Sequence, residues 1–236
     1  MNLVLLGPPG AGKGTQAKLL EDSRSLTKLS TGDMLRAAVA AGTQLGRKAG
    51  AIMERGELVP DELVIKLIAE RMDQGESGEG FIFDGFPRTI AQAEALDRLF
   101  EERGKTLDRV VVMEVDDDAL VERIAGRFAC ANCGEGYHDL YKLPKVKGVC
   151  DRCGGTEFVR RKDDNAEVVR ARLKAYHAQT KPLIDYYRRQ GKVSAVNGMA
   201  DIPTVAKEIG QALGAKAAKG GKNRKRHEVD LVKRNR

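Results

Sequence analysis

Residues 3 to 16 read Leu-Val-Leu-Leu-Gly-Pro-Pro-Gly-Ala-Gly-Lys-Gly-Thr-Gln, an apolar strand that runs directly into a glycine-rich loop with a lysine. Glycine has no Cβ, so the backbone of such a loop can curl with its N–H groups pointing inward. The start of the following helix adds the positive end of its dipole, and Lys13 adds a full charge. The stretch therefore predicts a cradle for phosphate groups at the end of a buried strand.

The spacing Gly7-x4-Gly12-Lys13 fits the Walker A pattern, but the residue after the lysine is Gly14 and the expected hydroxyl appears one place later, on Thr15. This departure argues against direct magnesium ligation by the loop hydroxyl, and it is the form found in nucleoside monophosphate kinases. An ordinary strand-turn-helix, with glycines for tight packing, is the alternative. It is less favoured because the strand, the loop and the helix all occur in order.

The composition is that of a globular chain with one or two domains, since 42% of its 236 residues are apolar and 32% are charged. No run of eighteen apolar residues exists, and no basic leader precedes the first strand. We therefore expect neither a membrane span nor a signal peptide, and we expect a cytoplasmic monomer.

The net charge of +7 lies in the last part of the chain. Residues 215 to 236 hold nine Lys or Arg against Glu228 and Asp230, so the rest of the chain is balanced. We expect this tail to be disordered. One alternative is that the tail contacts nucleic acid or acidic lipid. The other is that it is a solvated appendage without such a partner. For the balanced core we expect no nucleic-acid partner.

Short apolar runs alternate with amphipathic stretches, which is typical of an α/β fold with a parallel sheet covered by helices. Thr89 with Gln92 and Asp164 with Glu167 have the spacing of capping boxes at helix starts. The expected strands are five: Leu3 to Leu6, Thr27 to Ser30, Phe81 to Phe83, Val110 to Val115 and Val193 to Val196.

Two segments break this alternation and are expected to be inserts, residues 30–59 with helical material and residues 127–163 with many turns. The core would then consist of residues 1–29, 60–126 and 164–214. Ligands of open parallel sheets bind at the carboxyl ends of the strands, so the inserts would cover that site.

The four cysteines have the spacing Cys130-x2-Cys133-x16-Cys150-x2-Cys153, which closely fits a four-thiolate zinc site. Four ligands leave no open position, so the zinc would be structural and would hold together an insert of about 37 residues that cannot build its own core. Buried thiols and disulfides are the alternatives, and His138 is a spare ligand.

A strand that ends in Asp84 is followed by Gly85 and Arg88. A carboxylate at that strand end can hold magnesium through water. Planar guanidinium groups match phosphate oxygens two at a time, so we also predict phosphate contacts from arginines that stand near the edges of the inserts. These are Arg36, Arg123, Arg127, Arg161 and Arg172.

Several of these motifs resemble bacterial adenylate kinases of the long-lid, zinc-bearing type. They are Gly7 to Thr15, Ser30-Thr31-Gly32-Asp33-Met34-Leu35-Arg36, Asp84-Gly85-Phe86-Pro87-Arg88 and Arg161-Lys162-Asp163-Asp164, and the resemblance runs over residues 1 to about 213. It implies a P-loop nucleoside monophosphate kinase fold with a five-stranded parallel sheet, an insert at 30–59 that binds the monophosphate and a zinc lid at 127–163. It also implies transfer of a phosphoryl group from MgATP to AMP, giving two ADP, and a role in adenine nucleotide homeostasis.

The resemblance assigns the site residues in four groups. For ATP it implies Gly10, Ala11, Gly12, Lys13, Gly14, Thr15, Arg127, Gly136, Tyr137, Met199 and Ala200. For AMP it implies Thr31, Arg36, Glu57, Leu58, Val59, Gly85, Arg88, Gln92, Arg161 and Arg172. For catalysis it implies Lys13, Asp84, Arg88, Arg123, Arg161 and Arg172. For hydrated magnesium it implies Asp84 with help from Asp33.

Two other functions are alternatives. A kinase for UMP or CMP would use the same loop, and Thr31 and Gln92 favour adenine only through the resemblance. A nucleic-acid-binding zinc-ribbon protein would use the cysteines and the tail. It is disfavoured because the core is charge-neutral and only 5% of the residues are aromatic.

Overall fold

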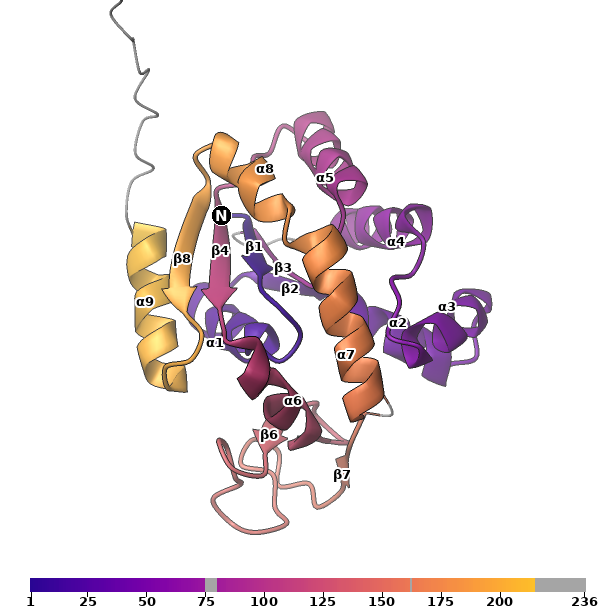
Figure 1. The fold of residues 1–236 in the computed structure, drawn as a ribbon, viewed down its shortest axis with the longest axis vertical. Coiled ribbons are helices and arrows are strands. Elements are labelled where there is room, and N and C mark those ends of the chain that lie inside the picture. The colour runs from indigo at the N-terminus through magenta and orange to yellow at the C-terminus, as the bar shows by residue number, and fades with distance from the viewer. Residues whose placement is uncertain (75–79, 162, 215–236) are drawn as a thin grey trace, which may run out of the picture.

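The computed structural model describes residues 1–74, 80–161 and 163–214. Its centre is a parallel sheet of five strands in the order β2-β3-β1-β4-β8, flanked by helices (Figure 1). The strands are β1 (Leu3–Leu6), β2 (Thr27–Ser30), β3 (Phe81–Asp84), β4 (Arg109–Glu114) and β8 (Val193–Asn197). Each begins and ends within one residue of its predicted bounds, which confirms the α/β fold class.

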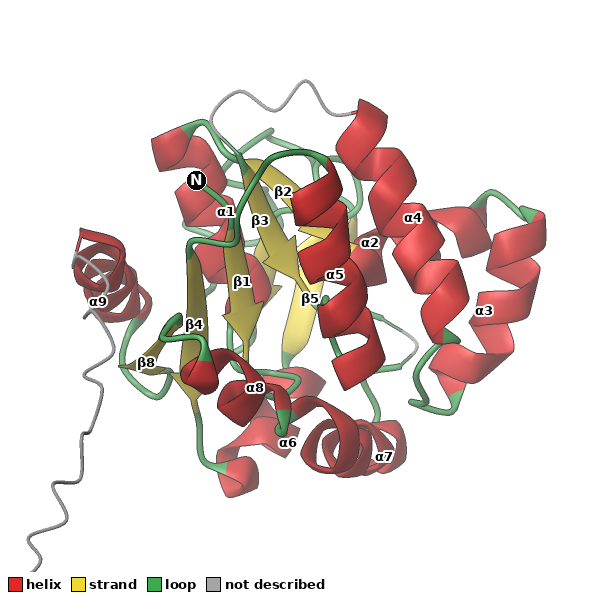
Figure 2. Ribbon diagram, turned by 90° about the horizontal axis from the view of Figure 1, so that it is seen from above, coloured by secondary structure: helices red, strands yellow, loops and turns green. Residues whose placement is uncertain are grey.

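Helices occupy both faces of the sheet because the side chains of each strand alternate between them (Figure 2). Val4 and Leu6 pack in one apolar cluster, and Leu3 and Leu5 pack in another. The first cluster includes residues of α4 (Asp61–Gln74), α5 (Ile90–Glu102) and α8 (Leu183–Arg189), and the second includes residues of α1 (Lys13–Arg24) and α9 (Ile202–Gly214).

The carboxyl ends of the strands face α6 (Asp117–Ala125) and a small antiparallel sheet, toward which the arrows of β4 and β8 point in Figure 1. The small sheet has the order β6-β5-β7, with β5 at Arg127–Cys130, β6 at Gly136–His138 and β7 at Phe158–Val159. The chain therefore enters this sheet directly from the end of α6.

The remaining helices are α2 (Thr31–Ala40), α3 (Gln44–Glu54) and α7 (Ala166–Ala175), and α7 continues into a π-helical turn, η1 (Tyr176–Thr180). α2 and α3 pack mainly against each other. The expected disorder of the tail, residues 215–236, concerns residues outside those described. Within the described part of the chain, none of the helices has the length and apolar character needed to cross a bilayer.

Two predicted capping boxes are corrected. The residue that caps α7 is Asn165, whose side chain accepts the Val168 N–H at 3.0 Å, because the Asp164 carboxylate is instead paired with Arg127 and Arg172. At α5, Thr89 accepts the Gln92 N–H at 3.2 Å as predicted. The Gln92 amide does not return to the N–H of Thr89, however, since it accepts the N–H of Arg88 at 2.8 Å.

Asn2 joins three parts of the sheet at the entry to β1. Its side chain accepts the Phe81 N–H at 3.1 Å and donates to the Thr106 carbonyl at 2.8 Å, and the residue is buried. Both backbone groups would lose their partner if the amide were removed.

We predict that Asn2→Ala lowers the free energy of unfolding by about 2–4 kcal/mol, because each unsatisfied buried polar group costs about 1–3 kcal/mol. Urea unfolding followed by circular dichroism measures the change. A loss below about 0.5 kcal/mol, the range of neutral surface substitutions, would contradict this role.

Candidate functional site

The glycine-rich loop connects β1 to α1 through backbone that only glycine adopts easily. Gly7 and Gly10 have φ values of 150° and 86°. A Cβ on Gly7 would lie 2.8 Å from the Met113 carbonyl oxygen, and one on Gly10 would lie 2.8 Å from Cγ1 of Ile124. The loop therefore lies tightly against β4 and α6, and its residues Gly10 to Thr15 run into the first turn of α1.

Lys13 bends back over this loop. Its ammonium group donates to the carbonyls of Gly7 and Pro8 at 2.7 and 2.8 Å. The pKa of Lys13 is lowered to about 7, mainly because the group is removed from water. The attraction of Asp84 opposes this shift, and the positive charge of Arg88 contributes to it. A phosphate bound in the loop would replace these carbonyls with a negative charge and would favour the charged lysine.

Asp84 lies beside the loop at the end of β3, the strand that pairs with β1. A Cβ on Gly14 would be 3.3 Å from Oδ2 of Asp84, so a larger residue there would crowd the carboxylate. This is a physical reason for glycine where the Walker pattern has a hydroxyl. The geometry brings the predicted magnesium carboxylate to the phosphate loop.

A pocket lies between α2, the residues after α3, and the start of α5. Nine of the ten residues predicted for AMP line it: Thr31, Arg36, Glu57, Leu58, Val59, Gly85, Arg88, Gln92 and Arg172. The tenth, Arg161, meets Arg36 through a shared carboxylate, that of Asp33. The pocket thus collects residues that are up to 141 positions apart, from Thr31 to Arg172.

The polar groups at the back of this pocket are held by one another. Thr31 donates to the Gly85 carbonyl at 2.8 Å, and Nε of Arg88 donates to the same oxygen at 2.8 Å. Burial and the nearby charge of Arg172 lower the pKa of Arg88 to about 10. Arg88 therefore stays charged at neutral pH in a place where an anion would relieve its repulsion from Arg172.

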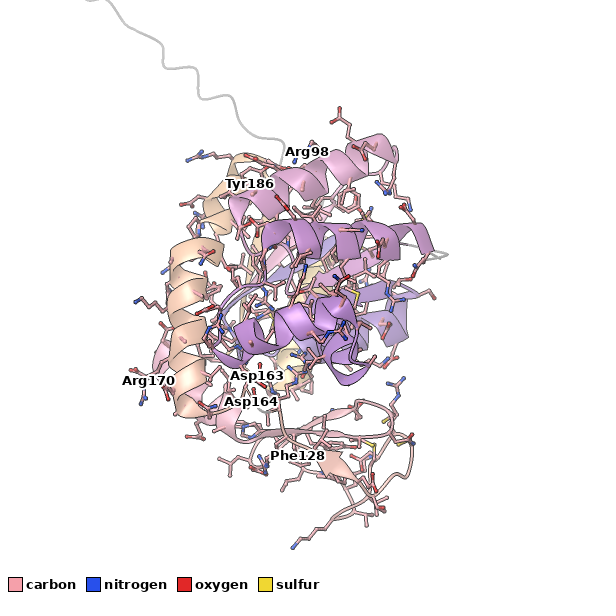
Figure 3. The ribbon with its side chains drawn as sticks, turned by 90° about the vertical axis from the view of Figure 1, so that its right-hand side faces the viewer. Arg98, Phe128, Asp163, Asp164, Arg170 and Tyr186 are labelled. Carbon is pink, nitrogen blue, oxygen red and sulfur yellow. The ribbon has the colours of Figure 1, made fainter. Side chains whose placement is uncertain are left out.

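Two carboxylates pair with Arg127, at the start of β5, and with Arg172 of α7. Arg172 contacts Asp163 at 3.0 Å and Asp164 at 3.5 Å. Nε of Arg127 donates to Asp164 at 2.9 Å. Figure 3 places Asp163 and Asp164 between the body of the molecule and the small sheet that carries Phe128. Both carboxylates lie where bound phosphates would compete for the same guanidinium groups.

Asp33, on α2, also pairs with several cationic side chains. It contacts Arg36 at 2.6 Å, Arg161 at 3.3 Å and Lys28 at 3.4 Å. Burial opposes ionisation, but Arg36, Lys28 and Arg161 together hold the pKa of Asp33 well below its usual range. Burial and repulsion from Arg127 lower the pKa of Arg161 to about 10. Asp33 therefore balances Arg36, Arg161 and Lys28 in this structure.

Arg123 contacts the segment around residues 198–200. Arg123 donates to the carbonyl of Gly198 at 2.8 Å and to that of Met199 at 3.4 Å, and it lies 5.5 Å from the centre of the Tyr141 ring. Arg123 thus points toward the segment predicted to contact ATP and does not join the Asp163 and Asp164 pairs. Ala200 follows in the turn that is closed by the Asn197 carbonyl.

The four cysteines meet in the small sheet as free thiols whose sulfur atoms all lie within 4.8 Å of one another. Tetrahedral zinc with Zn–S bonds of about 2.3 Å requires sulfur atoms about 3.8 Å apart. The pairs Cys130 with Cys153 and Cys133 with Cys150 are each 3.6 Å apart. The donor set therefore fits a closed four-thiolate metal site.

Tyr137 belongs to the interior of the small sheet. Its ring stacks on Phe128 at 5.6 Å, and its hydroxyl donates to Cys150 and accepts the Asp151 N–H at 2.7 Å. The side chain is buried, whereas Gly136 is exposed. A nucleotide contact from these two positions would therefore have to come from the backbone.

Four residues that contact the predicted site residues are not among those that the sequence predicts for the site: Asp61, Asp163, Asp164 and Thr180. Thr180 donates to the Arg88 carbonyl at 2.8 Å, and Asp61 accepts the Gln92 amide at 2.7 Å. Asp163 and Asp164 could have been predicted, since acidic residues two and three positions after the site arginine Arg161 are natural ion-pair partners for a cluster of arginines. No local signal connects Thr180 with Arg88, 92 positions away, or Asp61 with Gln92, 31 positions away.

Comparison with known proteins gives one consistent family. A family model described as adenylate kinase matches residues 5–192. An adenylate kinase of Paramagnetospirillum magneticum is 58% identical over 215 residues, covering 91% of this chain and 99% of that protein. An adenylate kinase of Rhizorhabdus wittichii is 59% identical, covering 90% of this chain and 99% of that protein. An adenylate kinase of Novosphingobium aromaticivorans is 55% identical, covering 92% of this chain and 100% of that protein.

The lowered pKa of Lys13 predicts that binding a polyphosphate takes up protons. At a pH of about 8, above the pKa of about 7, Lys13 is mostly neutral in the free protein, and a bound anion restores its charge. At a pH of about 6 Lys13 is already charged, so this uptake disappears. Calorimetry with tripolyphosphate in buffers of different ionisation enthalpy measures it.

Lys13→Arg is the matched control, because arginine stays protonated at both pH values. The wild-type protein should take up close to one proton more than Lys13→Arg at the higher pH. Equal uptake by the two proteins would contradict the lowered pKa.

Proposed function

The chain belongs to the adenylate kinase family and catalyses reversible phosphoryl transfer from ATP to AMP, giving two ADP. We propose that Lys13 and the arginines between the phosphate loop and the pocket at Thr31 and Gln92 stabilise the transferred group. The observation that carries this proposal is that Arg88 and Arg172 line the pocket while their charges act on Lys13 in the phosphate loop. A phosphoryl group that passes from the loop to the pocket would travel through this cluster.

The two nucleotides are proposed to bind at opposite ends of the cluster. ATP phosphates would lie on the N–H groups of Gly10 to Thr15, with Arg127 and the backbone near Gly136, Tyr137, Met199 and Ala200 as further contacts. AMP would fill the pocket lined by Thr31, Arg36, Glu57, Leu58, Val59, Gly85, Arg88 and Gln92, with Arg161 and Arg172 at its phosphate.

The chemistry needs no general base. An AMP phosphate oxygen, already ionised at neutral pH, attacks the γ-phosphorus of ATP in line, a new P–O bond forms, and the bond to the bridging β–γ oxygen breaks to release ADP. The protein positions the two nucleotides and neutralises charge on the moving group. Lys13, Arg88, Arg123, Arg161 and Arg172 are the proposed donors.

Adenylate kinases use magnesium with ATP, and the protein supplies carboxylates where it would sit. We propose that Asp84, beside the phosphate loop, holds the hydrated ion through its waters. Asp33 would contribute once Arg36 and Arg161 have turned from it to phosphate. The ion supplies charge neutralisation at the β- and γ-phosphates.

We propose that residues 1–29, 60–126 and 164–214 act as the core, that residues 30–59 close over AMP, and that residues 127–163 close over ATP. Closure would exclude water and so favour transfer to AMP over hydrolysis. Asp33 and Arg161, which come from the two inserts and pair at 3.3 Å, support an approach of these segments.

The four-cysteine site is proposed to hold structural zinc, since it has four thiolate donors and no place for substrate. We further propose a monomer that works in the cytoplasm, where thiols stay reduced and adenine nucleotides are available. For the basic segment 215–236 we propose contact with polyanions.

Lys13→Ala should lower kcat by on the order of a hundredfold or more, comparable to the loss of one donor from an oxyanion hole. A coupled assay of ADP formation from MgATP and AMP measures this. Comparing AMP with GMP, CMP and UMP in the same assay tests the preference for adenine. Turnover close to that of the wild-type protein would remove the role assigned to Lys13.

Cys130→Ser should lower bound zinc and lower Tm by on the order of 10 °C, because a structural zinc contributes several kcal/mol to folding. The value of kcat, measured well below the new Tm, should stay within about twofold. Metal analysis and calorimetry give the first two quantities. A large loss of kcat in the folded variant would show that the site is more than structural.

A further inference from the structure

Three side chains at the meeting point of α4 and α5 form a closed ring of hydrogen bonds. Gln92 donates from Nε2 to Oδ1 of Asp61 at 2.7 Å. Thr89 donates from its hydroxyl to Oδ2 of Asp61 at 2.9 Å and accepts the backbone N–H of Gln92 at 3.2 Å. Both oxygens of the Asp61 carboxylate are therefore engaged, and the carboxylate cannot turn without losing a bond.

This ring fixes which way the Gln92 amide faces. A carboxylate only accepts hydrogen bonds, so the atom next to Asp61 must be Nε2. On the other side, the backbone N–H of Arg88 only donates, and it contacts Oε1 at 2.8 Å. Turning the amide by 180° would place an oxygen against Asp61 and an NH₂ group against the Arg88 N–H.

The fixed amide keeps one N–H of Nε2 and one lone pair of Oε1 for a ligand. Gln92 is buried and lines the proposed AMP pocket together with Thr31, Gly85 and Arg88. The donor and acceptor complement the edge of adenine, where N1 accepts and the 6-amino group donates. Hypoxanthine and guanine carry the reverse pattern, with an N1–H donor and an O6 acceptor.

We propose that Asp61 is a specificity-determining positioning residue, which locks the Gln92 amide in the orientation that accepts adenine and rejects 6-oxopurine monophosphates. Without Asp61, only the Arg88 N–H would still favour this orientation, so the amide could turn toward a 6-oxopurine with the loss of one hydrogen bond instead of two. With Asp61 in place, a 6-oxopurine must either face two mismatched groups or break two buried hydrogen bonds. Asp61 itself lies behind Gln92 and acts through it.

This inference rests on the proposed contact between Gln92 and the base. Asp61→Asn tests it, since an asparagine can face Gln92 with either its oxygen or its NH₂ group and can still bond the Thr89 hydroxyl, which donates and accepts. The substrates to compare are AMP and IMP, because IMP has the 6-oxo pattern without the 2-amino group of GMP. The bulk of that amino group would be a second difference from AMP.

The full-length Asp61→Asn protein should show a ratio of kcat/KM for AMP over IMP that is about tenfold or more below that of the wild-type protein. Most of the change should lie in KM for IMP. A general loss of stability would lower activity toward both substrates alike and leave the ratio constant. An unchanged ratio would therefore overturn the proposal.

Asp97→Asn is the matched control. Asp97 lies on α5, and it also accepts a hydroxyl and a glutamine amide, from Tyr186 at 2.7 Å and Gln190 at 3.2 Å, but it does not line the pocket. This variant should keep the wild-type ratio. A fall in the ratio equal to that of Asp61→Asn would mean that loss of any such carboxylate relaxes the site, and would also overturn the proposal.

The variant Gln92→Leu tests the contact between Gln92 and the base separately from the fixing of the amide by Asp61. If it raises KM for AMP while Asp61→Asn leaves the AMP-to-IMP ratio unchanged, the base contact stands and the lock is wrong. If Gln92→Leu leaves KM for AMP unchanged, the base contact itself is wrong and the lock falls with it. A raised KM together with a lower ratio in Asp61→Asn supports both.

Discussion

The structure depends on holding several cations close together, partly out of water, between the phosphate loop and the pocket lined by Thr31 and Gln92. Desolvation and mutual repulsion lower the pKa values of Lys13 to about 7 and of Arg88 and Arg161 to about 10. Bringing like charges together in this way is costly in the free protein. The cost is recovered when phosphate oxygens enter, so the same arrangement that destabilises the empty site favours binding and charge neutralisation during transfer.

Carboxylates reduce this cost until the substrates bind. Asp163 and Asp164 hold Arg127 and Arg172, and Asp33 holds Arg36 and Arg161. In the proposed binding mode these acids and the phosphates compete for the same guanidinium groups, so substrate binding would release the arginines from them. The parallel sheet makes the arrangement possible, since the ends of β1, β2 and β3 place Lys13, Asp33 and Asp84 at one edge.

Local patterns predicted the parts of the site that depend on backbone shape or on spacing. The loop from Gly7 to Thr15 is defined by glycines that the chain needs at tight approaches, and the four cysteines by two short turns. The five strands followed from apolar runs. Partners that are distant in sequence could not be predicted in this way. Asp164 has the spacing of a helix cap, yet Arg127, 37 residues earlier, takes its carboxylate. The ring of Asp61, Thr89 and Gln92 appears only when α4 and α5 pack.

The most direct test of this account is a crystal structure with the bisubstrate mimic diadenosine pentaphosphate. The account predicts one adenosine in the pocket lined by Thr31 and Gln92, phosphates in contact with Lys13 and Arg88, and Arg172 turned from Asp163 to a phosphate oxygen. A mimic bound away from the loop at Gly10 to Thr15, with Arg127 and Arg172 still on Asp163 and Asp164, would contradict it.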